Sequence, residues 1–245
     1  VQPAMGDSGL ALGACIQTTI KHDINNYKRS KITFKDSFHG PDFSNDIDQF
    51  IKLHRLDYDI TEMENPSRTI AKHIFENKII GFWNDRMEWG PRALGSRSIL
   101  LNTFDKKVND TLNERLNRTE FMPFAPAVID YMAKTYFPKY NEDNPSADYM
   151  TITYDVDPKY HDELQAVVHV DGTARPQIVK KKITPYYYDI IDEFYKISGC
   201  GAIVNTSFNA HEEPIVSSAE YALNGLKNNR VDLLVLGRFL LSNKA

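Results

Sequence analysis

The sequence predicts a mixed α/β domain. From residue 66 onward, apolar segments of strand length alternate with segments that have helical periodicity, and turn-forming residues separate them. Hydrophobic residues make up 42% of the 245 positions, which is ordinary for a protein with a sizeable core. The length suits one large domain, or one domain together with part of another.

The chain divides into three parts by composition. Residues 1–25 contain a small, apolar stretch, 8–20, that predicts a close-packed helix. Residues 26–65 are polar and turn-rich and are interpreted as a linker or a segment that wraps over a domain. Residues 66–245 form the main predicted domain. Because the first segment starts as if in mid-domain, we expect the chain to be the C-terminal part of something longer.

The first half of the main domain predicts two helices and three strands. A helix is expected over 66–77, where isoleucines lie one turn apart and an asparagine follows. Strands are expected at 78–83 and 98–104. Asp105 is expected to cap the next helix, whose Val108, Leu112 and Leu116 would line one face. Residues 123–129 resume strand character after their prolines.

The second half alternates in the same way. The expected elements are a strand at 150–156, a hairpin within 166–179 turning at Asp171-Gly172, a helix over 186–199 ending at Gly199, a strand at 201–209, a helix opened by a Ser217–Glu220 capping box, and a strand at 231–237.

A loop rich in arginine and glycine follows the first strand. Arg86, Arg92 and Arg97 lie within twelve residues of one another in the stretch NDRMEWGPRALGSRSIL. Guanidinium groups match phosphate and carboxylate oxygens in pairs, and three that lie close together repel one another unless an anion is present. The group therefore favours a polyphosphate ligand. For each arginine alone, pairing with Asp85, Glu88 or other local acids to hold the loop is an equally good interpretation.

Three polar stretches, 84–97, 171–177 and 205–209, are expected to follow apolar strands. Ligands bind at the carboxyl ends of strands in α/β sheets, so these stretches are candidates for a single site. Nothing local distinguishes Arg175, in the second stretch, from a solvated hairpin arginine.

The third stretch offers neutral polar groups. Asn205, Ser207 and Asn209 alternate along an extended segment and would point to one side. Their amide and hydroxyl groups can hold a base, a ribose or phosphate oxygens, although a plain polar turn after a strand is an equally good interpretation.

Several functions are disfavoured by composition and motifs. A net charge of −4 argues against nucleic acid as a partner. Cys15 and Cys200 are too few for a disulfide framework, which indicates a reducing, cytoplasmic location, and no apolar run reaches the length of a membrane span. The scattered histidines form no metal motif, and the chain has no GxSxG elbow, Walker A loop or Rossmann fingerprint.

The stretch RMEWGPRALGSRSIL (86–100) resembles the C-terminal region of the ATP-dependent O-carbamoyltransferases, the family of nodulation and antibiotic-tailoring enzymes. FMPFAPAV (121–128), ARPQIV (174–179), NTSFN (205–209) and EEPIVSSAEYAL (212–223) fit the family pattern in order. The resemblance covers most of residues 66–245 and implies a YrdC-like α/β fold.

PAMGDSGLALGA (3–14) is similar to the end of the family's preceding transferase domain, which is of the actin/hexokinase type and holds iron. The resemblance therefore assigns residues 1–25 to the end of that upstream domain. Asp7 matches an aspartate ligand of that metal, while the matching histidine pair is absent from this chain. The resemblance therefore implies iron only together with a missing N-terminal transferase domain, and leaves Asp7 as an orphaned ligand.

The resemblance also implies an activity. The C-terminal domain would use ATP, Mg²⁺ and carbamoyl phosphate to form carbamoyl adenylate and release pyrophosphate, and the upstream domain would pass the carbamoyl group to a hydroxyl. By position, Arg92, Arg175, Asn205 and Ser207 match residues used around the nucleotide and the carbamoyl group. The full set expected to bind ATP and carbamoyl phosphate is Arg86, Arg92, Arg97, Arg118, Arg175, Asn205, Ser207 and Asn209.

The chain departs from the family before the PFAP run. Many members carry a lysine and two arginines there, whereas LNRTEFMPFAP is one residue shorter and has Asn117 and Met122 near two of those positions. Arg118 is a candidate replacement for one of the cations. This departure suggests one alternative to the enzyme, a nucleotide-binding domain without transferase chemistry. A second alternative comes from the implied fold: a YrdC-like module that binds RNA, which the net charge of −4 disfavours.

Overall fold

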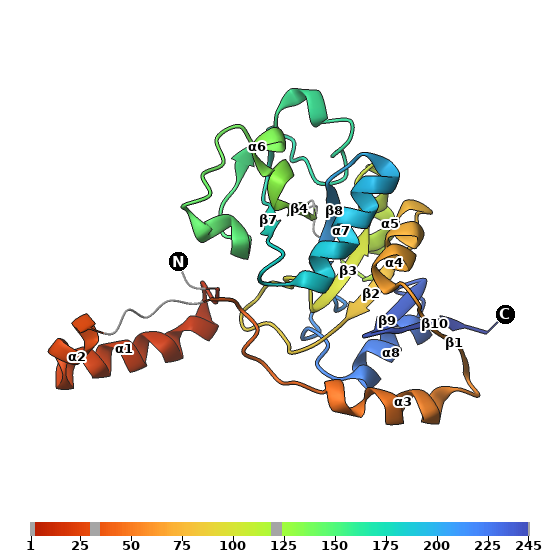
Figure 1. Cartoon of the computed structure of the whole chain (residues 1–245), viewed down its shortest axis with the longest axis horizontal. Coiled ribbons are helices and arrows are strands. Elements are labelled where there is room, and N and C mark those ends of the chain that lie inside the picture. The colour runs from red at the N-terminus through yellow and green to blue at the C-terminus, as the bar shows by residue number, and fades with distance from the viewer. Residues whose placement is uncertain (1–2, 30–34, 119–123, 245) are drawn as a thin grey trace.

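A mixed eight-stranded sheet forms the centre of the molecule in the computed structural model, which describes residues 3–29, 35–118 and 124–244 (Figure 1). The strand order is β1-β10-β9-β2-β3-β8-β4-β7. These strands are β1 (Tyr58–Glu62), β2 (Ile80–Trp83), β3 (Arg97–Leu101), β4 (Ala125–Ile129), β7 (Gln177–Val179), β8 (Ala202–Ser207), β9 (Leu233–Leu236) and β10 (Phe239–Asn243). A separate pair is formed by β5 (Tyr154–Asp155) and β6 (Thr173–Ala174).

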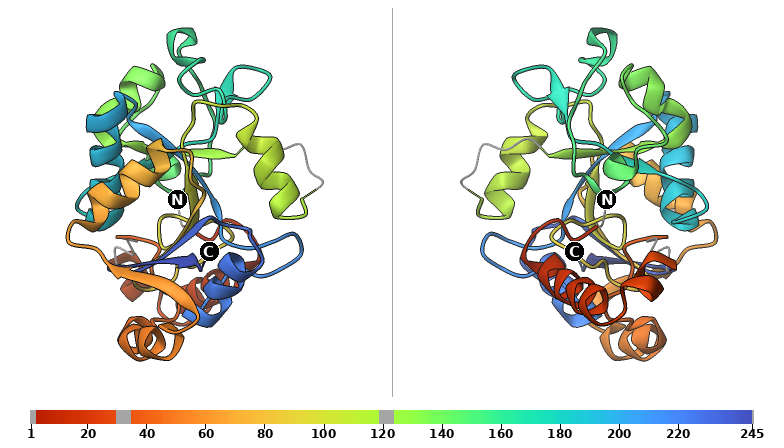
Figure 2. Two further views of the ribbon diagram at one scale, coloured as in Figure 1. Left: turned by 90° about the vertical axis from the view of Figure 1, so that its right-hand side faces the viewer. Right: turned by 90° about the vertical axis from the view of Figure 1, so that its left-hand side faces the viewer.

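Helices lie on both faces of the sheet (Figure 2). The α-helices of the described residues are α1 (Leu10–His22), α2 (Ile24–Arg29), α3 (Ile47–His54), α4 (Pro66–Phe75), α5 (Val108–Arg115), α6 (Ala133–Tyr136), α7 (Pro185–Ser198) and α8 (Ala219–Lys227). In Figure 2, α4 and α7 lie together on one face, and α5 lies on the other. The fold class is therefore α/β, as the sequence predicts.

Strand β2 shows how the core is divided between the two faces. Phe82 packs against Tyr187 of α7, with ring centroids 6.0 Å apart. Its neighbour Gly81 points the opposite way, because successive residues of a strand alternate between faces. A side chain at Gly81 would come within 2.7 Å of the Phe208 ring, which also contacts Gly225 of α8. The core therefore has two layers, one under α7 and one under α8.

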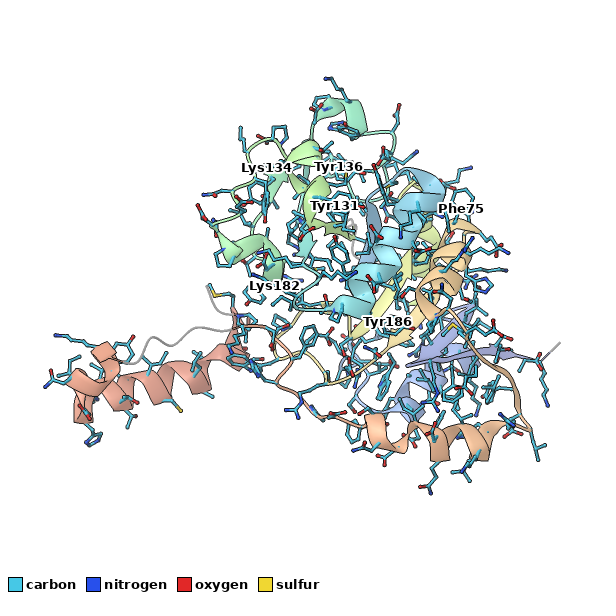
Figure 3. The ribbon with its side chains drawn as sticks, in the orientation of Figure 1. Phe75, Tyr131, Lys134, Tyr136, Lys182 and Tyr186 are labelled. Carbon is cyan, nitrogen blue, oxygen red and sulfur yellow. The ribbon has the colours of Figure 1, made fainter. Side chains whose placement is uncertain are left out.

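Helix α7 is fixed at both ends. Pro185 occupies its first turn, and Gly199 ends it in the left-handed conformation with φ of 80°. Near its start, Tyr186 donates a hydrogen bond to the carbonyl of Gly237 at 2.9 Å (Figure 3). Residues 185–198 thus match the helix predicted over 186–199.

An extended segment crosses the outside of the arginine loop. Trp89 N donates to the carbonyl of Ser37 at 2.7 Å, Gly40 N donates to Met87 O at 2.9 Å, and Met87 N donates to Pro41 O at 3.0 Å. Ser37 is buried. Before this segment, α1 projects from the body and has no buried residue (Figures 1 and 3).

Several local predictions were wrong. The strand expected at 150–156 is only β5, because Met150 takes a left-handed φ of 54° after a 3₁₀ helix. The hairpin expected within 166–179 does not form, since β6 pairs with β5, while β7 pairs with β4. The Ser217–Glu220 capping box is also absent: Ser218 is the N-cap of α8, and its side chain makes no capping bond.

Asp105 does not cap α5 as expected. Its carboxylate accepts a hydrogen bond from Lys107 N at 2.8 Å in the turn before the helix, and Lys107 occupies the N-cap position. Elsewhere, β1 and α3 form within the segment predicted as a linker. Within the described residues, no helix combines the length and the apolar character that crossing a bilayer requires.

Candidate anion pocket at the sheet edge

One edge of the sheet gathers the three polar stretches. Trp83 pairs with Arg97, and Ser98 pairs with Ser207, so the carboxyl ends of β2 and β8 lie at the same edge as the start of β3. The start of β4 lies there too, because Ala125 pairs with Asn205. Stretch 171–177 reaches this edge differently from the expectation: it precedes β7 rather than following a strand.

A pocket of about 670 Å³, measured out to open solvent, lies at this edge. It is lined by Pro91, Arg92, Ala93, Asn113, Arg118, Phe124, Ala125, Met150, Arg175, Asn205, Thr206 and Ser207. The four residues expected to act around the nucleotide and the carbamoyl group are all in this set. No lining residue in the described part of the chain carries a negative charge.

Of the three guanidiniums that line the pocket, those of Arg92 and Arg175 have no protein partner among the described residues. Neither makes a hydrogen bond or an ion pair within the described residues, and the buried Nε of Arg175 is among the unpaired atoms. Burial lowers the pKa of both groups, and the charge of Arg92 lowers that of Arg175 further. Two half-buried cations that repel each other are stabilised by an anion placed between them. This makes the pocket a candidate anion site.

Asn205 lies at the wall of the pocket in a fixed orientation. Its Nδ2 donates to Ala93 O at 3.0 Å and to Gln177 Oε1 at 2.8 Å. Gln177 is itself oriented because its Nε2 donates to Leu94 O at 2.7 Å. Because both neighbouring groups are acceptors, the nitrogen of the Asn205 amide must face them, and this fixes the position of Oδ1. Asn205 Oδ1 is an acceptor that has no donor among the described residues. An unpaired buried acceptor costs about 1–3 kcal/mol, which a ligand N–H would offset.

Arg118 lies in the pocket but binds the protein. Its guanidinium donates to Thr206 Oγ1 at 3.1 Å and to Ser207 Oγ at 3.2 Å. It also reaches the backbone carbonyl of Asn209 at 3.2 Å. In this arrangement Arg118 holds the end of β8 and presents the Ser207 hydroxyl to the pocket.

Arg97 has a structural environment. Its side chain is fully buried, and its guanidinium carbon lies 4.1 Å from the centroid of the Trp83 ring. The guanidinium donates to the carbonyls of Asn84, Asp85, Ser96 and Ser217 at 2.8–3.1 Å. Burial lowers its pKa to about 10. With these bonds made and no exposure, the expectation that Arg97 contacts a phosphate is corrected: it ties the loop to the core.

Two other expected residues, Arg86 and Asn209, lie away from the pocket lining. Arg86 is exposed on the outer part of the loop, near Asp42. Asn209 lies beyond the end of β8 and outside the pocket lining, where its Nδ2 donates to Ala210 O and Glu213 O. Its Oδ1 still lies near Ser207, because both side chains accept from the same nitrogen of Arg118.

Asp7 is exposed, at the start of a short 3₁₀ helix. Among the described residues, no three His, Cys, Asp or Glu side chains gather to hold a metal ion. A single carboxylate is too few ligands for an iron site, so the residues present do not fit one.

The departure before the PFAP run is partly visible. Asn117 takes a left-handed φ of 53° just after α5, which reverses the chain toward Arg118. Met122 lies outside the described residues.

Two functional candidates were missed in the sequence, Gln177 and Glu88. Gln177 is a polar residue in an otherwise apolar strand, and this pattern could have singled it out. From the sequence, Glu88 is a possible partner for arginine side chains. The structure instead places its carboxylate against backbone amides.

The fold and the pocket together define the class of protein: an α/β domain with a cationic, ligand-sized pocket at the sheet edge. The model of the family described as "Carbamoyltransferase C-terminus" matches residues 71–243. The chain therefore belongs to this carbamoyltransferase C-terminal family.

Curated relatives agree with this assignment. The chain is 33% identical over 249 residues to the uncharacterized protein MJ1058 of Methanocaldococcus jannaschii, covering 99% of this chain and 40% of that protein. It is 32% identical over 247 residues to nodulation protein NolO of Bradyrhizobium diazoefficiens, covering all of this chain and 44% of that protein. The chain thus spans less than half the length of these relatives.

Solved structures show that the fold is YrdC-like. Full-length HypF in a phosphate- and nucleotide-bound form matches with a TM-score of 0.53 and 20% identity, covering 73% of this chain and 26% of HypF. Sua5 of P. abyssi, complexed with L-threonine, matches with a TM-score of 0.51 and 12% identity, covering 70% and 46%. At these identities the likeness concerns the fold alone.

Proposed function

We propose that this domain binds carbamoyl phosphate and ATP at the sheet-edge pocket and forms carbamoyl adenylate. The observation that carries the proposal is the pair Arg92 and Arg175, two half-buried guanidiniums without protein partners in the described part of the chain. Family membership supports carbamoyl chemistry. Of the solved neighbours, HypF is described as phosphate- and nucleotide-bound.

The balanced reaction consumes one water. Water cleaves carbamoyl phosphate to carbamate and phosphate. A carbamate oxygen then bonds to the α-phosphorus of ATP, the α–β P–O bond breaks, and pyrophosphate leaves. Negative charge grows on the phosphorus oxygens in both steps, and fixed guanidiniums stabilise such charge. The neutral polar groups of the pocket, such as those of Asn205 and Ser207, would position the carbamate against ATP.

Asn205 is the residue that would recognise the carbamoyl group. Its Nδ2 is committed to Ala93 and Gln177, so only the acceptor Oδ1 is available to a ligand. The amino group of a carbamoyl ligand beside Asn205 would supply the missing donor. An acetyl group has a methyl at that place and would leave Oδ1 unpaired.

Mg²⁺ is treated as part of the MgATP substrate. The pocket lining in the described residues has amide and hydroxyl oxygens but no carboxylate, which does not fit a resident Mg²⁺ site. Transfer of the carbamoyl group to a hydroxyl is proposed to occur in a further domain, because the relatives are more than twice as long as this chain.

The test incubates the chain with labelled ATP, Mg²⁺ and carbamoyl phosphate and measures pyrophosphate. We expect release that depends on carbamoyl phosphate and is lost in Arg175→Ala. Binding of ATP without pyrophosphate release would instead favour a nucleotide-binding module, and a salt-sensitive shift of RNA would favour the RNA-binding alternative.

A further inference from the structure

Glu88 belongs to the arginine loop, but it lies outside the pocket lining. Its carboxylate is 5% exposed, and Oε1 accepts hydrogen bonds from three backbone amides: Leu94 N at 2.8 Å, Ser96 N at 2.7 Å and Arg97 N at 3.1 Å. Bonds from N–H groups to an ionised carboxylate are about twice as strong as neutral ones. The carboxylate therefore closes the loop into a ring from residue 88 to residue 97.

The ring holds the backbone that forms one side of the pocket. Arg92 lies inside it and makes no side-chain bond within the described residues, so its guanidinium is placed mainly by its own backbone. The next two carbonyls orient the pocket amides, since Ala93 O accepts from Asn205 and Leu94 O accepts from Gln177. Leu94 is thus bound by Glu88 through its N–H and by Gln177 through its C=O.

Tight packing leaves this loop little freedom around Gly95. Gly95 has a φ of +101°, and a Cβ at this position would lie 2.2 Å from the ring of Tyr187. Without the carboxylate, the amides of Leu94 and Ser96 would be buried and unpaired. The loop would then have to move or hydrate to satisfy them.

We infer that Glu88 is a positioning residue: it holds the 88–97 loop so that Arg92 and the carbonyls of Ala93 and Leu94 are set for an anion. The choice of anion rests on the function proposed above. The role itself follows from the three amide bonds and from the absence of Glu88 from the pocket lining.

Whether removal of the Glu88 charge weakens or strengthens anion binding distinguishes a positioning role from a purely electrostatic one. Glu88 places a negative charge near a cationic pocket, so removing that charge would strengthen anion binding if only Coulomb forces mattered. Loss of positioning has the opposite effect. A role limited to folding would lower the melting temperature and leave the affinity of the folded protein unchanged.

The experiment compares Glu88→Gln, Glu88→Asp and the wild-type chain. The first keeps the shape and removes the charge, and the second keeps the charge and shortens the reach. Asn102→Ala is the matched control: Asn102 is equally buried and bonds Ile74 O at 3.1 Å, away from the pocket. Calorimetry measures the Kd for carbamoyl phosphate and for inorganic pyrophosphate, and hydrogen exchange follows the amides of residues 94–97.

We expect both Glu88 variants to bind the two anions about tenfold more weakly and to exchange amides 94–97 faster, while Asn102→Ala loses stability only. Unchanged or tighter binding by Glu88→Gln, or unchanged exchange at 94–97, would overturn the inference. If the wild-type chain binds pyrophosphate but not carbamoyl phosphate, the proposed function fails, and the pyrophosphate and exchange data still decide the role of Glu88.

Discussion

Arg92 and Arg175 line one pocket from separate loops, and the charge of Arg92 lowers the pKa of Arg175. The two residues are distant in sequence and meet because the start of β7 lies at the same sheet edge as the loop after β2. Arginine pairs that lack acidic neighbours are costly in an empty pocket. Function therefore offers the simplest reason for their presence.

The first prediction concerns this pair. Arg92→Ala and Arg175→Ala should each weaken carbamoyl phosphate binding by about 10- to 100-fold, since each removes charge-assisted hydrogen bonds. Neither change should lower the melting temperature, because each relieves repulsion and breaks no protein bond in the described chain. Calorimetry measures the change in affinity for carbamoyl phosphate, and thermal unfolding measures the change in melting temperature. A clear loss of stability with unchanged affinity would show that the arginines serve the fold.

A second prediction tests the recognition of the amino group. Acetyl phosphate should support pyrophosphate release at least tenfold less well than carbamoyl phosphate, because it leaves Asn205 Oδ1 without a donor. Gln177→Leu should reduce this discrimination, since Gln177 orients Asn205. Comparing kcat/KM for the two substrates in both proteins is the measurement. Equal use of the two substrates by the wild-type chain would refute this role of Asn205.

The third prediction uses two glycines with left-handed backbones. Gly199→Ala should cost about 1 kcal/mol of unfolding free energy, because φ is 80° and the space around it is open. Gly95→Ala should cost about 2 kcal/mol or more beyond that, because its Cβ would collide with the Tyr187 ring. Urea unfolding of both variants gives the difference. Similar losses at the two sites would mean that the Gly95 loop is not held as described.

Sequence periodicity was enough for the elements that depend on local pattern. The strand at 78–83 and the helix ending at Gly199 are present because an apolar run and a left-handed cap act within a few residues. The hairpin at Asp171-Gly172 failed for a non-local reason: Thr173 and Ala174 pair with β5, while the preceding arm forms a turn that bonds Thr173 O through His169 N at 2.7 Å.

The site shows the same limit more sharply. Arg92 and Arg97 lie five positions apart in one motif, yet only Arg92 lines the pocket. Two contacts hold Arg97 away from the pocket. Its guanidinium stacks on the ring of Trp83, and it donates a hydrogen bond to the carbonyl of Ser217, which is distant in the sequence. Neither contact can be predicted from the residues that surround Arg97 in the sequence. Arg175 is the converse: nothing local distinguishes it in the sequence, yet it lines the pocket and has no protein partner within the described residues.

The fourth prediction concerns pH and the two thiols. At pH 8, a thiol reagent should modify exposed Cys15 and spare buried Cys200 in the native chain. Burial raises the pKa of Cys200 from 9.0 to about 12, so the native thiol keeps its proton where the unfolded thiol loses it. Stability should therefore fall as the pH rises above about 9. The wild-type melting temperature should drop more between pH 8 and 9.5 than that of Cys200→Ala; equal drops would contradict the assignment.

The most direct test of the pocket is a crystal structure of the chain soaked with carbamoyl phosphate, or with ATP and Mg²⁺. We predict the phosphate group within hydrogen-bonding distance of Arg92 and Arg175, with the carbamoyl nitrogen beside Asn205 Oδ1. Density for the anion elsewhere on the surface, with these two guanidiniums turned away from each other and from Ser207, would contradict the account.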